Sequence, residues 1–168
     1  IKLEQSKYGL VEVESVKGNT LVNVVTSYKN DRFDLNNATK LDDNYFKLQY
    51  GVDVNASYVR PKVGTHLYKP NTTYTVIVDI KENTCGKKLG LSAINSAIKT
   101  LKPRDFQNTL GISTSLITTG SNINIDDKGN PATHDLYFGI WEEDGGDLSK
   151  HITFRYWILE GDYANKPI

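Results

Sequence analysis

The sequence predicts an all-β protein, an antiparallel β-sandwich of eight to ten strands with at most one short helix. Almost every apolar stretch alternates apolar and polar residues with a period of two, which places one face of each strand in a core. These stretches are bounded by Gly, Asn, Asp or Pro, the residues that form turns. Many short strands separated by turns in this way are typical of a two-sheet sandwich.

The N-terminal half is predicted to begin with an entry hairpin in residues 1–25, in which residues 10–16 and 21–25 flank a Lys-Gly-Asn turn. Residues 26–44 are polar and rich in Asn and Asp, so we expect a long loop there. Strands are expected at residues 45–50 and 74–80. Their alternation points the following side chains inward: Phe46, Leu48, Tyr50, Tyr74, Val76, Val78 and Ile80.

In the C-terminal half, strands are expected at residues 89–94 and 109–119, with one or two helical turns at residues 92–101 and a loop at residues 121–133. Two further strands follow at residues 135–141 and 151–158, joined by an acidic Gly turn. We expect these last two strands to be antiparallel neighbours. Their inward side chains would be Leu136, Phe138, Ile140, Ile152, Phe154, Tyr156 and Ile158.

Length and composition limit the number of domains and exclude several classes of partner. A chain of 168 residues fits one domain, residues 1–168, with a core that needs no covalent staples. With 20 basic and 20 acidic side chains the net charge is zero, so we expect no nucleic-acid partner. No apolar run is long enough for membrane insertion. Cys85 is the single cysteine, which excludes an internal disulfide. The chain has no methionine, and we expect it to be part of a larger polypeptide.

The outward faces of the predicted strands carry an unusual set of side chains. Tyr137, Trp141, Arg155 and Trp157, with Asp79, stand where a solvated face would carry Thr, Lys and Glu. The C–H face of a sugar ring stacks on an aromatic side chain, and its hydroxyls need planar donors and acceptors such as Arg and Asp. These residues are therefore the candidate ligand-binding site. Alternatively, the 26–44 loop covers one tryptophan, or a β-bulge reverses the assigned faces.

No residue pattern favours catalysis, so we expect a protein that is not an enzyme. The four carboxylates in the turn at residues 142–147 are more typical of a solvated hairpin than of a glycosidase pair. Asp126 and Asp127 precede a glycine in the manner of a calcium loop, but the ligand spacing and the distal Glu of an EF-hand are missing. We expect no cofactor and no metal, and these two aspartates are the first candidates if a cation binds.

Three segments resemble one known family. Residues 8–23 (Tyr-Gly-Leu-Val-Glu-Val-Glu-Ser-Val-Lys-Gly-Asn-Thr-Leu-Val-Asn), residues 67–80 with their Lys-Pro-Asn-Thr-Thr-Tyr-Thr run, and the tail Leu-Glu-Gly-Asp-Tyr-Ala-Asn-Lys-Pro ending at residue 167 carry the resemblance. They are similar to the entry, central and closing segments of the jelly-roll, carbohydrate-binding-module-like domains of phage and prophage tail-fibre proteins of Gram-positive hosts. The resemblance implies a jelly-roll sandwich, an exit linker at residues 161–168, and a structural calcium as an option.

The resemblance also implies a function. It points to a receptor-binding module of a viral structural protein, located in the virion tail or extracellularly. Its partners would be a cell-surface polysaccharide or glycan and other domains of the fibre, often as a homotrimer. Two alternatives remain open from the sequence: a purely structural spacer domain of the fibre, and an accessory sugar-binding module of a secreted polysaccharide-degrading enzyme.

Overall fold

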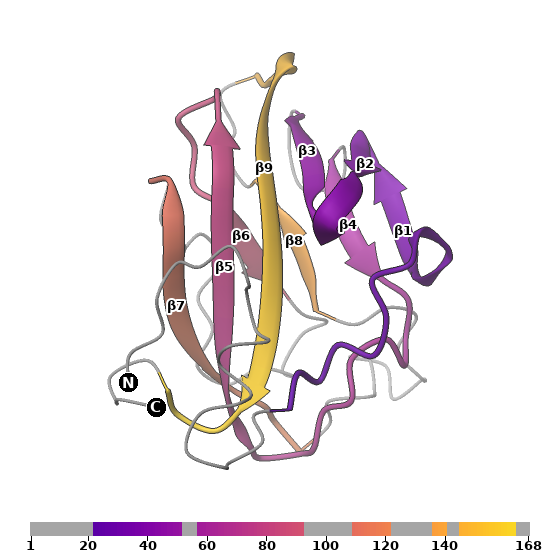
Figure 1. Ribbon diagram of the computed structural model, residues 1–168, viewed down its shortest axis with the longest axis vertical. Helices are drawn as coiled ribbons and strands as arrows, with labels where there is room; N and C mark the ends of the chain where they lie inside the picture. The colour runs from indigo at the N-terminus through magenta and orange to yellow at the C-terminus, as the bar shows by residue number, and fades with distance from the viewer. Residues whose placement is uncertain (1–21, 52–56, 93–108, 122–135, 141–144, 164–168) are drawn as a thin grey trace.

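The computed structural model describes residues 22–51, 57–92, 109–121, 136–140 and 145–163. Within these residues the strands form two antiparallel sheets that face each other across a core, which confirms the predicted β-sandwich (Figure 1). The elements in chain order are the 3-10 helix η2 (Asn30–Arg32), β1 (Phe33–Asn36), β2 (Ala38–Lys40), the 3-10 helix η3 (Asp42–Asn44), β3 (Phe46–Tyr50), β4 (Tyr58–Pro61), β5 (Thr73–Asn83), β6 (Gly90–Ser92), β7 (Gly111–Thr118), β8 (Tyr137–Gly139) and β9 (Asp147–Glu160).

The chain alternates between the two sheets. One sheet has the strand order β1-β4-β8-β6, and the other has the order β2-β3-β9-β5-β7. Among the described strands, β2 and β3 are the only consecutive pair in one sheet, and every other connection crosses to the opposite sheet. The longest strand, β9, lies between β3 and β5 in the centre of the five-stranded sheet (Figure 1).

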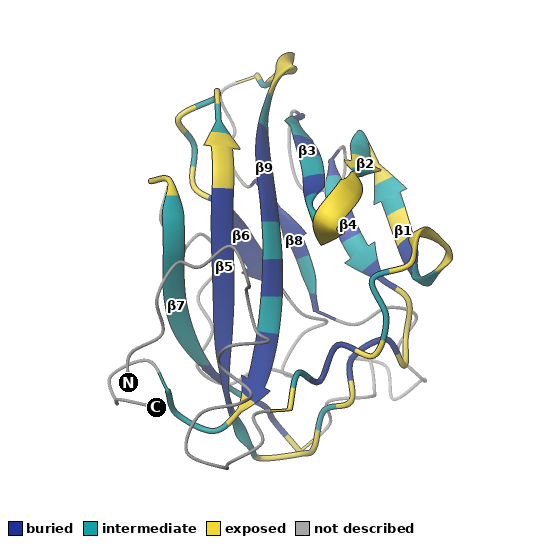
Figure 2. Cartoon of the chain, viewed as in Figure 1, coloured by how far each residue is buried: buried dark blue, intermediate teal, exposed yellow. Residues whose placement is uncertain are grey.

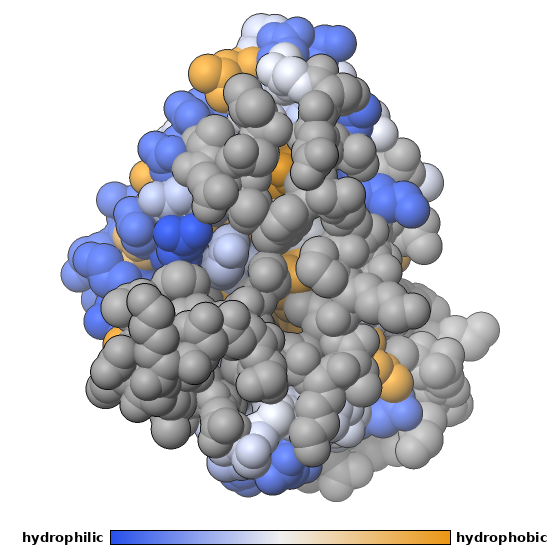
Figure 3. All heavy atoms as spheres, turned by 180° about the vertical axis from the view of Figure 1, so that it is seen from behind, coloured by the Kyte–Doolittle hydropathy of each residue, from blue (hydrophilic) through white to orange (hydrophobic). Residues whose placement is uncertain are grey.

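The core lies between the sheets and is built from the predicted inward faces. All the inward side chains predicted for β3, β5, β8 and β9 are buried; β5 is buried along most of its length, and the buried residues of β9 lie in its C-terminal part (Figure 2). Aromatic rings join the two layers, because Phe138 of β8 packs with its ring centroid 4.6 Å from Tyr156 and 5.0 Å from Phe154 of β9. The side of the molecule opposite to Figure 1 presents mostly hydrophilic residues where described atoms reach the surface (Figure 3).

The predicted loop at residues 26–44 is wrong. This segment contains β1, β2 and both 3-10 helices, and Phe33 at the start of β1 is 5% exposed and packs with its ring centroid 4.8 Å from that of Phe46. The strands are only four and three residues long, with too few apolar residues to make a period visible. Asn37 between them adopts a φ of 47°, which Asn tolerates better than most residues.

The prediction that the last two strands are neighbours is also wrong. β8 pairs with β4 and β6 in the four-stranded sheet, whereas β9 pairs with β3 and β5 in the other. β8 and β9 therefore belong to opposite sheets and do not form a hairpin. Turn residues and alternation predict where strands end. They are the same whether the next strand pairs in the same sheet or enters the opposite sheet.

The remaining predicted elements have mixed outcomes. Strands β6 and β7 occur within the predicted segments at residues 89–94 and 109–119. Residues 22–25 form two isolated bridges, Asn23 to Leu159 and Val25 to His66, instead of a regular strand. The first arm of the entry hairpin, nearly all of the predicted helix and most of the loop at residues 121–133 lie outside the described residues. No helix in the described segments is long and apolar enough to cross a membrane.

Candidate functional site

Part of the predicted site assembles on the outer face of the five-stranded sheet. Asp79 of β5 lies directly opposite Arg155 of β9 in the strand register. Tyr45 immediately precedes β3, whose first residue Phe46 pairs with Phe154, so Tyr45 lies on the other side of Arg155. Trp157 follows two residues later on the same face of β9. We call Tyr45, Asp79, Arg155 and Trp157 the outer-face cluster.

A buried carboxylate organises the outer-face cluster. Asp79 is 2% exposed, and its Oδ2 accepts hydrogen bonds from Nε of Arg155 and from the hydroxyl of Tyr45, both at 3.0 Å. Its other oxygen, Oδ1, is buried and has no hydrogen-bond partner among the residues that the structure describes. A buried oxygen without a partner is unfavourable by about 1–3 kcal/mol, so this one calls for an explanation beyond stability.

Aromatic rings hold the cation of the cluster in place. The guanidinium carbon of Arg155 lies 4.7 Å from the ring centroid of Tyr45 and 5.1 Å from that of Trp157. The ammonium of Lys81 lies 5.0 Å from the centroid of the Tyr45 ring. Lys81 stands at a register shift of β5, between Ile80 and Glu82. Each such cation–π contact stabilises by roughly 0.5–2 kcal/mol. Tyr45, Arg155 and Trp157 are half-buried, so they retain surface for a ligand.

The electrostatics keep the Tyr45 hydroxyl protonated. Burial raises the pKa of Tyr45 above its ordinary value, and the negative charge of Asp79 raises it further. The hydroxyl therefore remains a hydrogen-bond donor to the Asp79 carboxylate at physiological pH. The cluster thus offers neutral aromatic surface beside a fixed pair of opposite charges.

Tyr137 does not join this cluster. It belongs to β8 in the four-stranded sheet, so the expectation that it lies beside Arg155 is wrong. There the guanidinium carbon of Arg60 lies 4.5 Å from the Tyr137 ring centroid and 3.9 Å from that of Tyr58. The physical reason is the crossing between β8 and β9, which sends outward residues of the two strands to opposite sides of the sandwich.

The other candidates fall elsewhere. Trp141, Asp126 and Asp127 lie outside the described residues. Within the described segments, no group of three or more His, Cys, Asp or Glu side chains could hold a metal ion. Burial raises the pKa of the Cys85 thiol, and its sulfur lies 3.3 Å from Oδ1 of Asn83. A raised pKa is the opposite of what a nucleophilic thiolate needs.

The same outer face is buried toward the end where β5 begins and β9 ends. Thr75, Ile77 and Leu159 are at most 3% exposed although they point away from the core. The start of the predicted exit linker is hydrogen-bonded here: the amide of Gly161 donates to the Thr73 carbonyl at 2.9 Å, and the amide of Tyr163 donates to the Thr75 hydroxyl at 2.9 Å. Tyr45, Arg155 and Trp157 of the outer-face cluster, by contrast, are half-buried.

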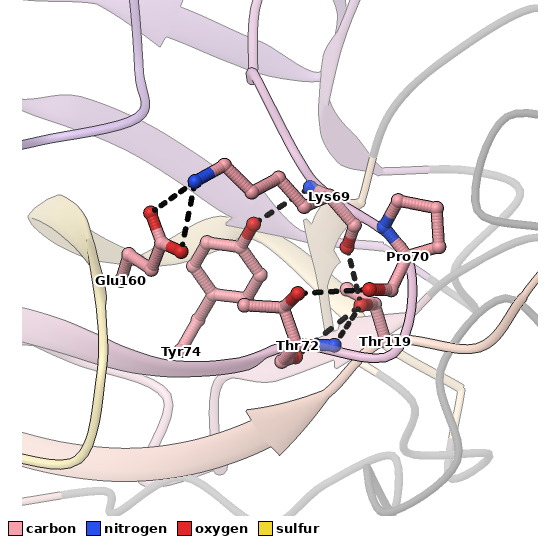
Figure 4. A network of polar contacts seen from close by, with 6 residues as sticks. All are labelled: Lys69, Pro70, Thr72, Tyr74, Thr119 and Glu160. Atoms are coloured by element: carbon pink, nitrogen blue, oxygen red, sulfur yellow. Dashed lines mark hydrogen bonds and ion pairs between the residues drawn. The ribbon is translucent and has the colours of Figure 1, made fainter.

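The Lys-Pro-Asn-Thr-Thr-Tyr run has a structural role. Thr119 donates to the Lys69 carbonyl at 2.6 Å and accepts from the Thr72 amide at 3.0 Å, while the Tyr74 hydroxyl accepts from the Lys69 amide at 2.7 Å (Figure 4). The ammonium of Lys69 pairs with Glu160 at 3.1 Å. These bonds tie the loop before β5 to the ends of β7 and β9, so the run stabilises the sandwich.

Sequence reasoning missed Tyr45 and Lys81. Tyr45 carried a usable signal, because the alternation of β3 already placed it opposite to Phe46 and therefore on the outer face. Lys81 carried none, because its orientation accompanies a register shift that the sequence does not mark. No protein-family model matches the chain, and no curated protein matches it either.

Proposed function

We propose that this chain is a non-catalytic carbohydrate-binding module of a phage or phage-like tail protein, and that it binds cell-surface glycan through the outer-face cluster. The observation that carries the proposal is the convergence of Tyr45, Asp79, Arg155 and Trp157 on one sheet face outside the core. Three of these residues were singled out from the sequence for the chemistry of sugar recognition.

The geometry supports sugar recognition in two ways. The rings of Trp157 and Tyr45 offer apolar surface for the C–H face of a pyranose. Arg155 uses Nε to hold Asp79, and its two Nη groups, which make no hydrogen bond to another described residue, can donate to ring hydroxyls. Because the guanidinium is fixed by a carboxylate and two rings, little side-chain entropy is lost when a ligand binds.

The same geometry supports binding over hydrolysis. Asp79 supplies the one carboxylate of the outer-face cluster, and both of its hydrogen bonds are made by protein groups. A glycosidase of the common type needs a second carboxyl group about 5–9.5 Å away across the scissile bond. The proposal places the protein in the virion tail or outside the cell, in a fibre whose repeated copies raise weak single-site affinities by avidity.

The experiment is a pull-down on Gram-positive cell walls and a glycan array, with Trp157→Ala as the test variant. We expect a loss of roughly 30-fold in affinity, which corresponds to an aromatic hot spot of ~2 kcal/mol. Leu67→Ala is the matched control, because Leu67 is 63% exposed and lies outside the cluster. Equal retention of both variants would contradict the proposed site, and no retention of the wild type on any glycan would contradict the function.

One observation favours a second candidate, a structural spacer domain. The outward-facing side chains of Thr75, Ile77 and Leu159 are buried, so part of the outer face of this sheet is used for packing. A spacer would bind no glycan, and acrylamide would fail to quench its tryptophan fluorescence. Quenchable tryptophan with glycan retention is the result expected for the binding module.

A further inference from the structure

The five-stranded sheet ends in a long edge strand. Within the described residues β7 pairs with β5 alone, so it forms one border of this sheet (Figure 1). β7 has eight residues, and its pairing with β5 runs from Thr73 to Ile80 without a register shift. The other border strands of the two sheets, β1, β2 and β6, have four, three and three residues. β7 is therefore the longest edge among the described strands.

Every second residue of β7 turns its backbone groups away from β5. The amide of Thr119 donates to the Thr72 carbonyl at 2.9 Å, which continues the ladder between the two strands. In an antiparallel ladder every second residue directs both its N–H and its C=O to the same neighbour. The odd-numbered residues of β7 therefore bond to β5. The N–H and C=O groups of Ile112, Thr114 and Leu116 point across the border, where no other described strand pairs with them.

β7 lacks the features that usually keep strand edges from pairing. Edges are commonly protected by charged side chains, by proline or by β-bulges. The sequence has neither a charged residue nor a proline between Asp105 and Asp126, and the pairing of β7 with β5 shows no bulge. The border strands β1 and β2, by contrast, carry Asp34 and Lys40. The edge of β7 is therefore suited to accept another strand.

The sequence of β7 is complementary to itself. When two copies run antiparallel with Thr114 opposite Thr114, Ile112 of each copy lies opposite Leu116 of the other, and Ser113 lies opposite Ser115. Cross-strand Thr–Thr pairs and apolar pairs stabilise antiparallel strands, and the absence of charge removes repulsion between identical strands. These side chains are half-buried, so they retain surface for such contacts (Figure 2).

We propose that the chain forms a two-fold symmetric dimer, in which β7 pairs antiparallel with β7 of a second copy. The pairing joins the two five-stranded sheets into one continuous sheet. The backbone groups of Ile112, Thr114 and Leu116 then form hydrogen bonds across the two-fold axis. Such an interface uses the same surface on both copies, so the assembly closes after two subunits.

The dimer has a consequence for the proposed glycan site. Because the two-fold axis is perpendicular to the sheet, both outer faces lie on the same side. β9 is the third strand from this border, so the two β9 strands are five strand spacings apart, roughly 24 Å at a spacing of ~4.8 Å. Two sites at this separation raise the affinity for a repeating glycan by avidity. This consequence rests on the proposed function, whereas the pairing itself does not.

The test is sedimentation velocity of the wild type and of variants over a roughly hundredfold range of concentration. We expect a reversible equilibrium between monomer and dimer. Thr114→Lys places two like charges opposite each other at the axis, and it should raise the dissociation constant of the dimer at least about tenfold. The matched control is Thr39→Lys, because Thr39 is an exposed residue of β2 at the opposite border of the same sheet. It should leave the dissociation constant unchanged.

A mixture of two variants separates a loss of pairing from a loss of folding. Thr114→Lys and Thr114→Glu should each be monomeric with the far-UV circular dichroism of the wild type. Their equimolar mixture should dimerise, because the axis then brings opposite charges together. A wild type that is monomeric at every concentration, an oligomer that Thr114→Lys leaves unchanged, or a mixture that stays monomeric would overturn the proposal. A monomeric wild type that binds glycan would overturn the pairing alone, and a dimer that binds none would contradict the proposed function alone.

Amide hydrogen exchange locates the contact. We expect the amides of Ile112, Thr114 and Leu116 to become protected as the protein concentration rises, because they bond to the second copy only in the dimer. The amides of Ser113 and Ser115 bond to β5 in both states, so their protection should change much less. Concentration-dependent protection that appears elsewhere and spares β7 would also overturn the proposal.

Discussion

Replacing Arg155 by Met tests the buried ion pair of the outer-face cluster. The side chains of Asp79 and Arg155 are 3% and 16% exposed, so the pair is largely removed from water. Within the described part of the chain, Arg155→Met leaves the Asp79 carboxylate with a single hydrogen bond, from Tyr45, because Oδ1 has no partner there. Removing one member of a buried pair destabilises by about 3–5 kcal/mol, and we expect a loss of free energy of unfolding in this range.

The assay is urea unfolding at neutral pH, followed by far-UV circular dichroism. The double variant Asp79→Leu with Arg155→Met removes both charges, and we expect it to recover most of the lost stability, because an apolar pair of similar volume tolerates burial. A loss below about 1 kcal/mol in Arg155→Met would refute the reasoning, since that is the size expected of a solvated pair. A double variant no more stable than the single would refute it as well.

Three further changes test the rest of the fold. Tyr74→Phe removes the acceptor of the Lys69 amide and should lower the free energy of unfolding by about 1–3 kcal/mol in urea titrations. Burial lowers the pKa of His66 to about 3 from 6.5, so the unfolded state takes up the extra proton first and stability should fall as the pH drops through that interval. His66→Gln should flatten this acid dependence, measured by melting temperature against pH. Gly161→Ala should destabilise by at least about 1 kcal/mol in thermal melts, because Gly161 has a φ of 114° and a Cβ there would lie 3.1 Å from the Tyr163 ring.

The sequence predicted the faces of the strands better than their neighbours. Inward residues such as Phe46 and Phe154 follow from alternation, which is a local property of each strand, and they are buried as expected. Which strands pair is decided by how the connections cross the sandwich, and turn residues look alike in both cases. This is why Arg155 and Asp79 could be placed on outward faces while Tyr137 was assigned to the wrong neighbourhood.

The candidate site was also predictable only in part. Asp79, Arg155 and Trp157 stood out because they interrupt otherwise apolar or Thr-rich strands. The register shift between Gln49 and Tyr50 was not predictable, because nothing in the sequence marks it.

The position of β9 has a consequence for how the chain reaches its native state. During synthesis β3 and β5 leave the ribosome long before β9, yet in the sheet each of them pairs with β9 and not with the other. The long apolar strand β5 therefore stays without its central neighbour until residue 160 has been made, and closure depends on contacts between residues far apart in sequence. We expect the nascent domain to expose strand edges throughout its synthesis, which makes it a natural client of chaperones that hold β-rich chains before they close.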